Sequence, residues 1–496
     1  MDTEAFELYL GDFSRRAAPF AGGFDGAAGG TICGDLIRIS LDPGVEGPKH
    51  AEAAEPGEHG GRIKRASFAA EGCAAARAAG AATAELAEGA TVLELAATGA
   101  SEISAALGGL GPQGAHAAEL AADALHRALA GLAGSEHQLA AAPRNGERVL
   151  VAMSGGVDST VAAIRERERG AEVVAVTLKL WADLRTDAEK SCCSPLAVLG
   201  ARAIARSLDI PHLTLDLEEA FRAGVVDGFV AGYRAGRTPN PCVVCNGELR
   251  IDAMLDLARR LGCSNLATGH YARVTDDGEG PLLSAAADPA KDQTYMLAGL
   301  APGSLARLRF PLSEMTKPEV REVAATAGLD VARKAESQDL CFLAGEGKRS
   351  FLARHGEIAD REGEIVDGAG QVLGRHSGHH AFTVGQRRGI GVASHEPLYV
   401  LETDAQSNRV VVGSRQQLAR TTVRVRGATL HRGGHRVDAV RLRYHSRALA
   451  CELAQVPAGE HDELSLELGE PAYGVAPGQT ACLLSGDLVV GRATIA

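Results

Sequence analysis

The residues Arg148-Val-Leu-Val-Ala-Met-Ser-Gly-Gly-Val-Asp-Ser-Thr160 join an apolar run to a glycine pair and then to a helical stretch. That order predicts a buried strand, a tight turn and a helix. Glycines at such a turn let a polyanion reach the unpaired N–H groups and partial positive charge of the helix N-terminus, which makes a phosphate site. Four small residues would line this site: Ser154, Gly155, Gly156 and Ser159.

Asp158 sets this turn apart from other phosphate loops. No lysine follows the glycines, so the turn is not the loop that grips a transferred γ-phosphate. An acid inside an anion site makes sense chiefly if it holds a magnesium ion that accompanies the phosphates. On these residues alone, a nucleotide site and an ordinary glycine turn both stay open.

A pair of cysteines offers a second kind of chemistry, in Thr238-Pro-Asn-Pro-Cys-Val-Val-Cys-Asn246. Two prolines stiffen the approach, and thiols three residues apart can face one centre at the start of the helix that follows. A helix N-terminus lowers the pKa of a thiol and raises its thiolate fraction. A single Cys-x-x-Cys is equally typical of a redox site or a zinc half-site.

The composition limits the function classes. The chain has 496 residues, of which 45% are hydrophobic and 23% charged, which predicts a globular protein of about two to four domains. No apolar run approaches the length of a membrane span and no signal segment is visible, so we expect a cytoplasmic protein. Ten cysteines are then catalytic, metal-binding or buried thiols rather than a disulfide framework. Cys263, Cys451 and Cys482 lie in patterns typical of core thiols, and Cys192-Cys193 fits a structural or nucleotide-proximal role.

The formal net charge of -12 means that any RNA contact requires a local basic face. One stretch offers such a face, because a single acid, Asp438, stands among many arginines between Arg409 and Arg447. The others are Arg415, Arg420, Arg424, Arg426, Arg432, Arg436, Arg441 and Arg443. A solvated surface is the usual explanation for a charge run, but this imbalance favours contact with a phosphate backbone.

Several strings together carry a family resemblance. Ser154-Gly-Gly-Val-Asp-Ser159 resembles the PP-loop of ATP pyrophosphatases. The further strings are Thr238 to Asn246, Ala267-Thr-Gly-His-Tyr271, Lys291-Asp-Gln-Thr-Tyr295, Glu336-Ser-Gln-Asp-Leu-Cys-Phe342 and Phe382-Thr-Val-Gly-Gln-Arg-Arg-Gly389. Over residues 147–496 their order is similar to that of the MnmA family of tRNA-specific 2-thiouridylases.

This resemblance implies an ATP-dependent replacement of the 2-oxygen of the wobble uridine by sulfur. Cys245 would be the nucleophile, Cys341 the persulfide carrier and Asp158 a magnesium ligand. ATP would contact Ala152, Met153, Ser154, Gly155, Gly156, Val157, Asp158, Ser159, Leu178 and Gly269. The tRNA would contact Asn240, Pro241, Cys242, His270, Lys291, Asp292, Gln293, Arg443, Tyr444 and Gln479. Its partners would be tRNAs of the lysine, glutamate and glutamine type and a cysteine desulfurase or sulfur-relay protein.

The first 140 residues carry a second resemblance. Cys33-Gly-Asp35, Gly72-Cys73 and Ala115-His116 resemble the iron-sulfur scaffold family of IscU and the NifU N-terminal domain. Thiolates, a carboxylate and an imidazole are ligand types that such a site needs. The family's cysteine after the histidine falls on Ala117, so Cys33, Asp35, Cys73 and His116 would bind zinc or a labile cluster. The alternative is a degenerate domain whose cysteines are buried.

The elements that must position these residues form a multidomain architecture. We expect an α+β domain over residues 1–140 and a linker over 141–147. Within the first domain, alternating patterns predict strands over 30–41 and 62–70, and alanine-rich stretches predict helices over 74–88 and 115–132. From 148 to 347, strands that alternate with helices predict an α/β PP-loop domain with a parallel sheet whose loops carry the chemistry. The helical pattern stops near residue 348, which predicts a small β-rich domain over 348–414 and a β-barrel over 415–496.

Two alternatives remain beside the thiouridylase. In one, Cys242, Cys245 and Cys341 hold an iron-sulfur cluster that delivers sulfide to the same substrate. In the other, the protein is an iron-sulfur scaffold whose ATPase half regulates cluster transfer, and it would neither bind nor modify tRNA.

Overall fold

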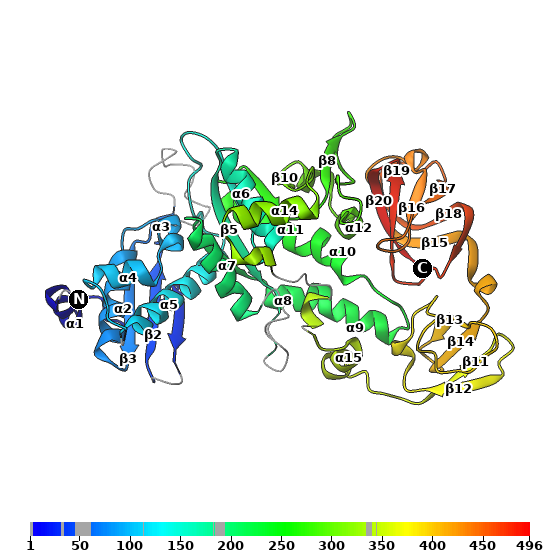
Figure 1. Ribbon diagram of the computed structural model, residues 1–496, viewed down its shortest axis with the longest axis horizontal. Coiled ribbons are helices and arrows are strands. Elements are labelled where there is room, and N and C mark those ends of the chain that lie inside the picture. The colour runs from blue at the N-terminus through cyan, green and yellow to red at the C-terminus, as the bar shows by residue number, and fades with distance from the viewer. Residues whose placement is uncertain are drawn as a thin grey trace.

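The computed structural model describes residues 3–30, 34–44, 61–112, 114–181, 183, 194–333, 340–343 and 345–496. Figure 1 shows the N-terminal domain at one end, a central α/β domain, and two β-rich domains side by side at the other end. None of the described helices is long and apolar enough to cross a membrane.

The N-terminal domain packs helices on a three-stranded antiparallel sheet in the order β1-β2-β3. Its strands are β1 (Phe24–Gly29), β2 (Leu36–Asp42) and β3 (Arg65–Glu71), and its helices are α1 (Thr3–Gly11), α2 (Ala74–Ala87), α3 (Val92–Ala97), α4 (Ala100–Ala106) and α5 (Ala115–Ala133). The two alanine-rich helices predicted from the sequence are therefore confirmed as α2 and α5. Alanines allow close packing, and a Cβ on Gly26 of β1 would lie only 2.0 Å from the carbonyl oxygen of Ala124 in α5.

The central domain is built on a five-stranded sheet in the order β10-β7-β4-β5-β6. All four pairings are parallel, as predicted. The strands are β4 (Arg148–Ala152), β5 (Glu172–Lys179), β6 (His212–Asp216), β7 (Asn265–Thr268) and β10 (Leu308–Arg309). The helices include α6 (Val157–Glu168), α7 (Pro195–Ser207), α8 (Glu218–Phe221), α9 (Asp227–Arg234), α10 (Pro241–Cys245), α11 (Ile251–Arg260), α12 (Thr294–Leu297), α13 (Pro302–Leu305) and α14 (Lys317–Thr326).

The next domain contains a four-stranded sheet in the order β12-β11-β14-β13. Its strands are β11 (Gly363–Val366), β12 (Val372–His376), β13 (Tyr399–Asp404) and β14 (Arg409–Gly413). The expectation that helices stop near residue 348 is wrong, because α15 (Lys348–Gly356) follows. Its sequence is too polar to show a helical apolar pattern, and the helix is held by burying Phe351 and Leu352 in an aromatic cluster of the central domain.

The C-terminal domain is a closed barrel of β15 (Ala419–Leu430), β16 (Ala439–Arg441), β17 (Leu449–Leu453), β18 (Gly459–Tyr473), β19 (Thr480–Ser485) and β20 (Leu488–Ile495). Pairing of β15 with both β18 and β20 closes the sheet. A hairpin of the central domain, β8 (Arg273–Asp276) and β9 (Pro281–Ser284), extends this sheet by pairing β9 with β20. The barrel therefore shares a sheet with the central domain, which the sequence pattern did not predict.

The N-terminal domain is docked firmly on the central domain. Helix α5 lies against the edge strand β6, and one apolar core includes Leu125 and Leu129 of α5 together with Leu213 and Leu215 of β6. The segment expected to be a linker is also fixed, since Arg148 Nη1 donates to the carbonyl of Ala141 at 2.7 Å. The connection is a packed seam rather than a loose tether.

Candidate active site

The predicted phosphate turn lies between β4 and α6, at the carboxyl end of the parallel sheet. Gly155 has a φ of +70°, a backbone conformation that favours glycine, and Gly156 caps α6 without a side-chain hydrogen bond. Within the turn, Ser159 Oγ accepts from the backbone N–H of Ser154 at 3.1 Å and donates to the carbonyl of Gly156 at 3.0 Å. The helix start thus keeps amides that no side chain caps, as an anion site requires.

The remaining predicted nucleotide contacts surround this turn. Met153 and Val157 are buried and anchor its two ends, while Ala152 is half-buried at the end of β4. Leu178 is half-buried on the neighbouring strand β5 and packs against the aromatic cluster that also contains Cys245. The expected nucleotide residues therefore come from adjacent strand ends of one sheet.

Asp158 has a protein counter-ion that the sequence did not reveal. Lys317 Nζ lies 2.7 Å from each carboxylate oxygen of Asp158, and the Tyr271 hydroxyl donates to the same carboxylate at 2.9 Å. The lysine missing from the turn is thus supplied by the first residue of α14, and its side chain is 10% exposed. An acid inside the anion site is explained without a metal ion, and the magnesium role of Asp158 stays a prediction.

Gly269 lies against the turn from the end of β7. A Cβ on this residue would be 2.7 Å from the carbonyl carbon of Asp158 and from the backbone nitrogen of Ser159. The glycine therefore permits contact with the start of α6. Its neighbour His270 is held by two hydrogen bonds, to Thr268 Oγ1 at 2.8 Å and to Arg250 Nη2 at 3.1 Å. Burial and the Arg250 charge lower the pKa of His270 to about 3, so its ring is neutral.

The two thiols of the Cys-x-x-Cys motif lie on α10. Asn240 caps this helix by accepting from the backbone N–H of Val243 at 3.4 Å, and Pro241 occupies its first turn. Cys242 is half-buried and Cys245 is 6% exposed. The helix continues through a π-helical turn, η3 (Asn246–Arg250), into α11. Such π-turns are rare and are frequent at functional sites.

Cys341 lies close to the same structural unit. It begins the 3-10 turn η5 (Cys341–Leu343), whose Phe342 is buried in the aromatic cluster with Phe229. Cys245 belongs to this cluster, and the half-buried Cys341 packs against it. Helix α10 and the segment of Cys341 are therefore brought together although almost 100 residues separate them. Cys192 and Cys193 lie outside the described residues.

An ion-pair network that the sequence analysis missed holds the chain just after Cys341. Arg354 of α15 pairs with Glu346 and, at 2.6 Å, with Asp183, which also contacts His355 at 3.2 Å. The guanidinium supplies the positive charge that the two carboxylates need. This cluster is accordingly a structural clamp between the loop after β5 and α15.

Most predicted tRNA contacts lie where the barrel meets the central domain. Asp292 pairs with Arg441 at 2.8 Å, and the backbone N–H of Tyr271 donates to Gln293 Oε1 at 3.0 Å. Gln479 donates to the carbonyl of Thr238 at 2.8 Å. Asp292 and Gln479 thus join the central domain to the barrel close to the start of α10, whereas Gln293 holds the backbone within the central domain.

Three further residues of the predicted tRNA set lie in the same region. Arg443 donates to the carbonyls of Val384, at 3.1 Å, and of Gly474. The ring of Tyr444 lies 6.1 Å from that of Tyr295, and Lys291 is half-buried. The three side chains are therefore grouped where the barrel, the four-stranded domain before it and the central domain meet, with the Lys291 charge close to Tyr444.

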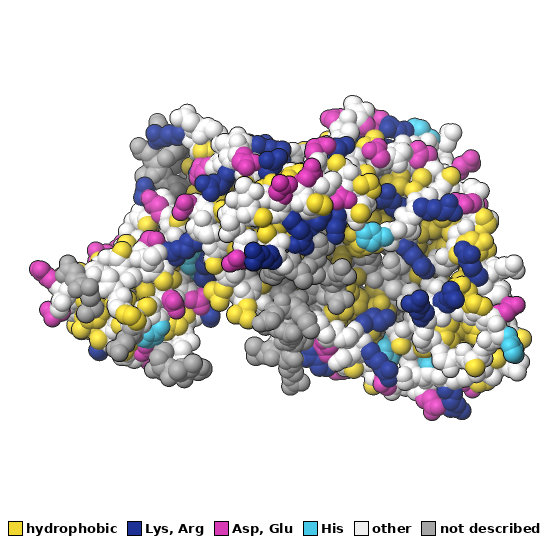
Figure 2. Space-filling model, in the orientation of Figure 1, with side chains coloured by type: hydrophobic (Ala, Val, Ile, Leu, Met, Phe, Trp, Pro, Cys, Tyr) yellow, Lys and Arg dark blue, Asp and Glu magenta, His cyan; other side chains and the backbone are white. Residues whose placement is uncertain are grey.

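The arginine-rich stretch is less basic in space than in sequence. Half of its ten arginines are ion-paired: Arg409 with Glu364, Arg432 and Arg436 with Asp277, Arg441 with Asp292 and Arg447 with Glu470. Figure 2 accordingly shows acidic side chains among the many lysines and arginines on the right half of this face. In the described chain, no ion pair involves Arg415, Arg420, Arg424 or Arg426, which remain available to an RNA backbone.

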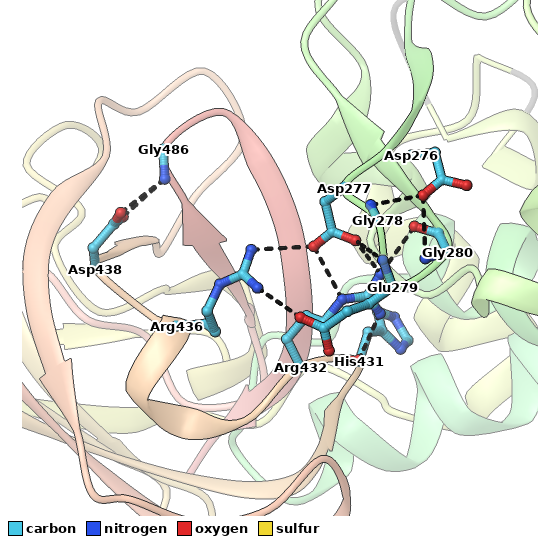
Figure 3. Close-up of polar contacts among 10 residues, drawn as sticks. All are labelled: Asp276, Asp277, Gly278, Glu279, Gly280, His431, Arg432, Arg436, Asp438 and Gly486. Carbon is cyan, nitrogen blue, oxygen red and sulfur yellow. Dashed lines mark hydrogen bonds and ion pairs between the residues drawn. The ribbon is translucent and has the colours of Figure 1, made fainter.

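Figure 3 shows the contacts of Arg432 and Arg436, two of the ion-paired arginines of this stretch. Arg432 contacts Asp277 of the β8–β9 turn at 2.7 Å, and Arg436 contacts the other oxygen of this carboxylate at 3.1 Å. The Arg432 and Asp277 side chains are only 6% and 7% exposed. Arg432 and the other hydrogen bonds hold the pKa of Asp277 well below its usual range. These arginines fasten the barrel to the central domain instead of facing RNA.

Three of the four predicted N-terminal metal ligands come together. Asp35 Oδ2 lies 3.2 Å from Cys73 Sγ and 2.8 Å from His116 Nε2. Burial acts to raise the pKa of Asp35, but hydrogen bonds from Cys73 and His116 outweigh it and the pKa falls. Ala117 is fully buried, and Cys33 lies outside the described residues. Thiol, carboxylate and imidazole within one cluster fit a metal site.

The three cysteines predicted to be core thiols are all buried, and burial makes them hard to ionise. It raises the pKa of Cys263 and of Cys482 to about 12 and that of Cys451 to about 11. All three are buried, so their assignment as core thiols is confirmed.

Comparison with protein families assigns each part of the chain. Residues 11–138 match a NifU-like N terminal domain, and 147–345 match a tRNA methyl transferase HUP domain. Residues 349–414 match a tRNA methyl transferase PRC-barrel domain, and 415–495 match an aminomethyltransferase beta-barrel domain.

Curated relatives agree with this division. The chain is 45% identical over 486 residues to the bifunctional protein NifU/MnmA of Rubrobacter xylanophilus, covering 95% of this chain and 93% of that protein. It is 43% identical over 350 residues to the tRNA-specific 2-thiouridylase MnmA of Acidithiobacillus ferrooxidans, covering 70% of this chain and 97% of that protein. A solved 4-thiouridine synthetase–RNA complex with ATP is 20% identical, covering 42% of this chain and 50% of that one, but its TM-score of 0.26 is too low to carry an argument.

Proposed function

The chain belongs to the family of tRNA-specific 2-thiouridylases, in the bifunctional form with a NifU-like N-terminal domain, and from this membership we propose how its residues divide the reaction. It is an ATP-dependent tRNA sulfurtransferase. The domain descriptions mention methyl transfer, but the curated relatives are named thiouridylases. Thiols and a phosphate turn within one domain suit sulfur insertion.

The first step activates the uridine. A carbonyl oxygen of the base is a poor leaving group until it is adenylated. We assign ATP to the turn from Ser154 to Ser159, where the uncapped amides of α6 and Lys317 face its phosphates. The 2-oxygen of the wobble uridine attacks the α-phosphorus, and pyrophosphate leaves. Asp158 would hold magnesium, which neutralises phosphate charge when bound, and Lys317 must then release this carboxylate.

The second step delivers sulfur. The terminal sulfur of a persulfide on Cys341 attacks carbon 2 of the base, and AMP leaves with the former 2-oxygen. The Cys245 thiolate then attacks the Cys341 sulfur, which forms a disulfide between the cysteines and frees the 2-thiouridine. A thiolate is the competent nucleophile, and its placement on α10 favours ionisation.

One observation carries this assignment. Leu178, Cys245 and Cys341 pack against a single aromatic cluster, although they come from three distant parts of the chain. The expected nucleotide wall, nucleophile and persulfide carrier therefore lie around one centre. The family relationship favours this persulfide route over the iron-sulfur alternatives, and a scaffold that never binds tRNA does not fit it.

The test is replacement of each thiol. Cys245→Ser and Cys341→Ser should each abolish thiolation, measured by mass analysis of tRNA nucleosides, while tRNA affinity stays close to wild type. Cys451→Ala removes a buried barrel thiol and is the matched control, with thiolation retained. Thiolated product from Cys341→Ser would exclude the persulfide scheme.

For the N-terminal domain we propose a metal or labile-cluster site at Asp35, Cys73 and His116, with Cys33 as the fourth ligand. The domain would supply sulfur or iron to the enzyme, and a cysteine desulfurase or relay protein would load it. The expected tRNAs are those of the lysine, glutamate and glutamine type. Nucleoside analysis of individual tRNAs from a deletion strain tests this substrate range.

A further inference from the structure

Arg250 is a cation whose surroundings the reaction scheme leaves unexplained. It ends the π-helical turn η3, five residues after Cys245. In the part of the chain that the structure describes, no carboxylate pairs with this guanidinium, and its Nε is buried without a hydrogen-bond acceptor. By contrast, Arg260 at the far end of the same helical run pairs with Asp256 at 2.8 Å. A desolvated charge without a counter-ion is costly, and it marks a place where an anionic ligand would bind.

Among the described residues, the Arg250 side chain makes one polar contact, and its partner is a neutral ring. An arginine has only donors, so His270 Nε2 accepts from Arg250 Nη2 at 3.1 Å and Nδ1–H donates to Thr268 Oγ1 at 2.8 Å. This pattern requires an uncharged His270, in agreement with its lowered pKa of about 3. His270 orients the guanidinium without neutralising it.

The position of Arg250 identifies the anion. His270 follows Gly269, which lies against the backbone of Asp158 and Ser159 at the start of α6. In the other direction, η3 connects Arg250 directly to Cys245. Arg250 therefore stands between the phosphate turn and the nucleophile. In an adenylated uridine, the group between these two positions is the α-phosphate.

We propose that Arg250 binds the α-phosphate of the adenylated uridine and the phosphate of the AMP that leaves. The inference rests on the proposed function. A half-buried guanidinium is suited to this role because it offers several N–H donors in a fixed plane. It stabilises the charge that gathers on the phosphate as its bond to carbon 2 breaks.

The experiment compares AMP with adenosine as ligands of the full-length protein, by calorimetric titration. Arg250→Met keeps an unbranched apolar stem and removes the guanidinium with its charge. We expect AMP affinity to fall at least tenfold, which corresponds to about 1.4 kcal/mol, with adenosine affinity unchanged. Arg250→Lys should lose less AMP affinity than Arg250→Met. The matched control is Arg259→Met, because Arg259 is 62% exposed on α11 and should change neither affinity.

The thermal midpoint separates this role from a structural one. Removing an uncompensated cation should leave the ligand-free midpoint of Arg250→Met equal or higher, as is common at functional sites. Unchanged AMP affinity, or an equal loss of AMP and adenosine affinity with a lower midpoint, would overturn the proposal. If the wild type thiolates tRNA while Arg250→Met binds AMP normally, only this inference fails. A wild type that neither binds AMP nor thiolates tRNA would overturn the proposed function as well.

Discussion

The central domain meets the N-terminal domain and the barrel in opposite ways. On one side, α5 covers the edge strand β6 with alanine and leucine side chains, and the two domains share one apolar core. On the other side, the β8–β9 hairpin joins the barrel through backbone hydrogen bonds, and Asp277 is clamped by Arg432 and Arg436. Apolar burial is not directional, whereas charged hydrogen bonds fix an orientation.

The difference follows from what each neighbour must do. The barrel and its seam carry the predicted tRNA contacts next to α10, so the orientation of the barrel decides where the substrate uridine arrives. The N-terminal domain carries none of the predicted tRNA contacts. Its seam contains two charged contacts among the described residues, Arg202 with Asp123 at 3.4 Å and Arg206 with Glu102, and the buried His126 lies close to Arg202. This contrast can be tested with substitutions that weaken one seam and leave the other intact.

The largest effect is expected from Asp277→Ala. It leaves Arg432 buried without its carboxylate, and unfolding free energy should fall by about 3 kcal/mol. Denaturant unfolding measures this value. Glu279→Ala is the matched control, because Glu279 meets Arg436 with 64% of its side chain exposed and should cost less than about 1 kcal/mol. Equal effects of the two substitutions would mean that the clamp does not orient the barrel.

A smaller effect is expected at the N-terminal seam. Asp123→Ala strands the Arg202 guanidinium, whose side chain is 17% exposed, and should cost about 2 kcal/mol. Adding Arg202→Met should recover most of this loss, since an apolar pair suits an apolar seam. If the double variant does not regain unfolding free energy, the N-terminal seam depends on charge, as the seam with the barrel does.

The third prediction concerns pH. Burial, with help from the Arg202 charge, lowers the pKa of His126 from 6.5 to about 3 in the folded protein. The unfolded chain therefore takes up a proton first as pH falls, so the stability from this residue is full above pH 6.5 and declines below it. His126→Gln keeps a donor for the Thr98 carbonyl but cannot titrate. Between pH 6.5 and 5, the unfolding free energy of His126→Gln should fall less steeply than that of the wild type. The two slopes should differ by up to about 1.4 kcal/mol per pH unit. Identical slopes would contradict this assignment.

The smallest effect on stability is expected from the exposed arginines of β15. Arg420→Ala with Arg424→Ala should change unfolding free energy by no more than about 0.5 kcal/mol. The slope of tRNA affinity against salt, on logarithmic axes, should nevertheless fall by up to about two units, roughly one for each lost phosphate contact. An unchanged slope would assign these arginines to solvated surface.

The helices, strands and turns that depend only on residues adjacent in sequence were predictable. The strand, turn and helix around Ser154 follow from an apolar run and two glycines, and both alanine-rich helices follow from propensity. Strand β1 was missed because Phe24-Asp-Gly-Ala-Ala-Gly29 contains a single strand-forming residue, Phe24, and its Gly26 is needed where α5 approaches.

The site was predictable only where its residues are close in sequence. Cys242 and Cys245 share a motif, whereas Lys317 reaches Asp158 from 159 positions away and no local pattern marks it. The arginine run misled for the same reason. Strand β18 supplies Glu470 to Arg447, and the β8–β9 turn supplies Asp277 to Arg432 and Arg436, so long-range contacts bring the acids that the local sequence lacks.

The shared sheet of the hairpin and the barrel also constrains the order of folding during synthesis. Proteins leave the ribosome from the N-terminus onward. The β8–β9 hairpin emerges together with the central domain, but its partner β20 is the latest of all these strands along the chain. Until β20 emerges, the hairpin has an unpaired edge and β15 cannot close the barrel. A ribosome that stalls within the barrel would leave an enzyme with its ATP turn and thiols already made but with an exposed strand edge, a species prone to aggregation.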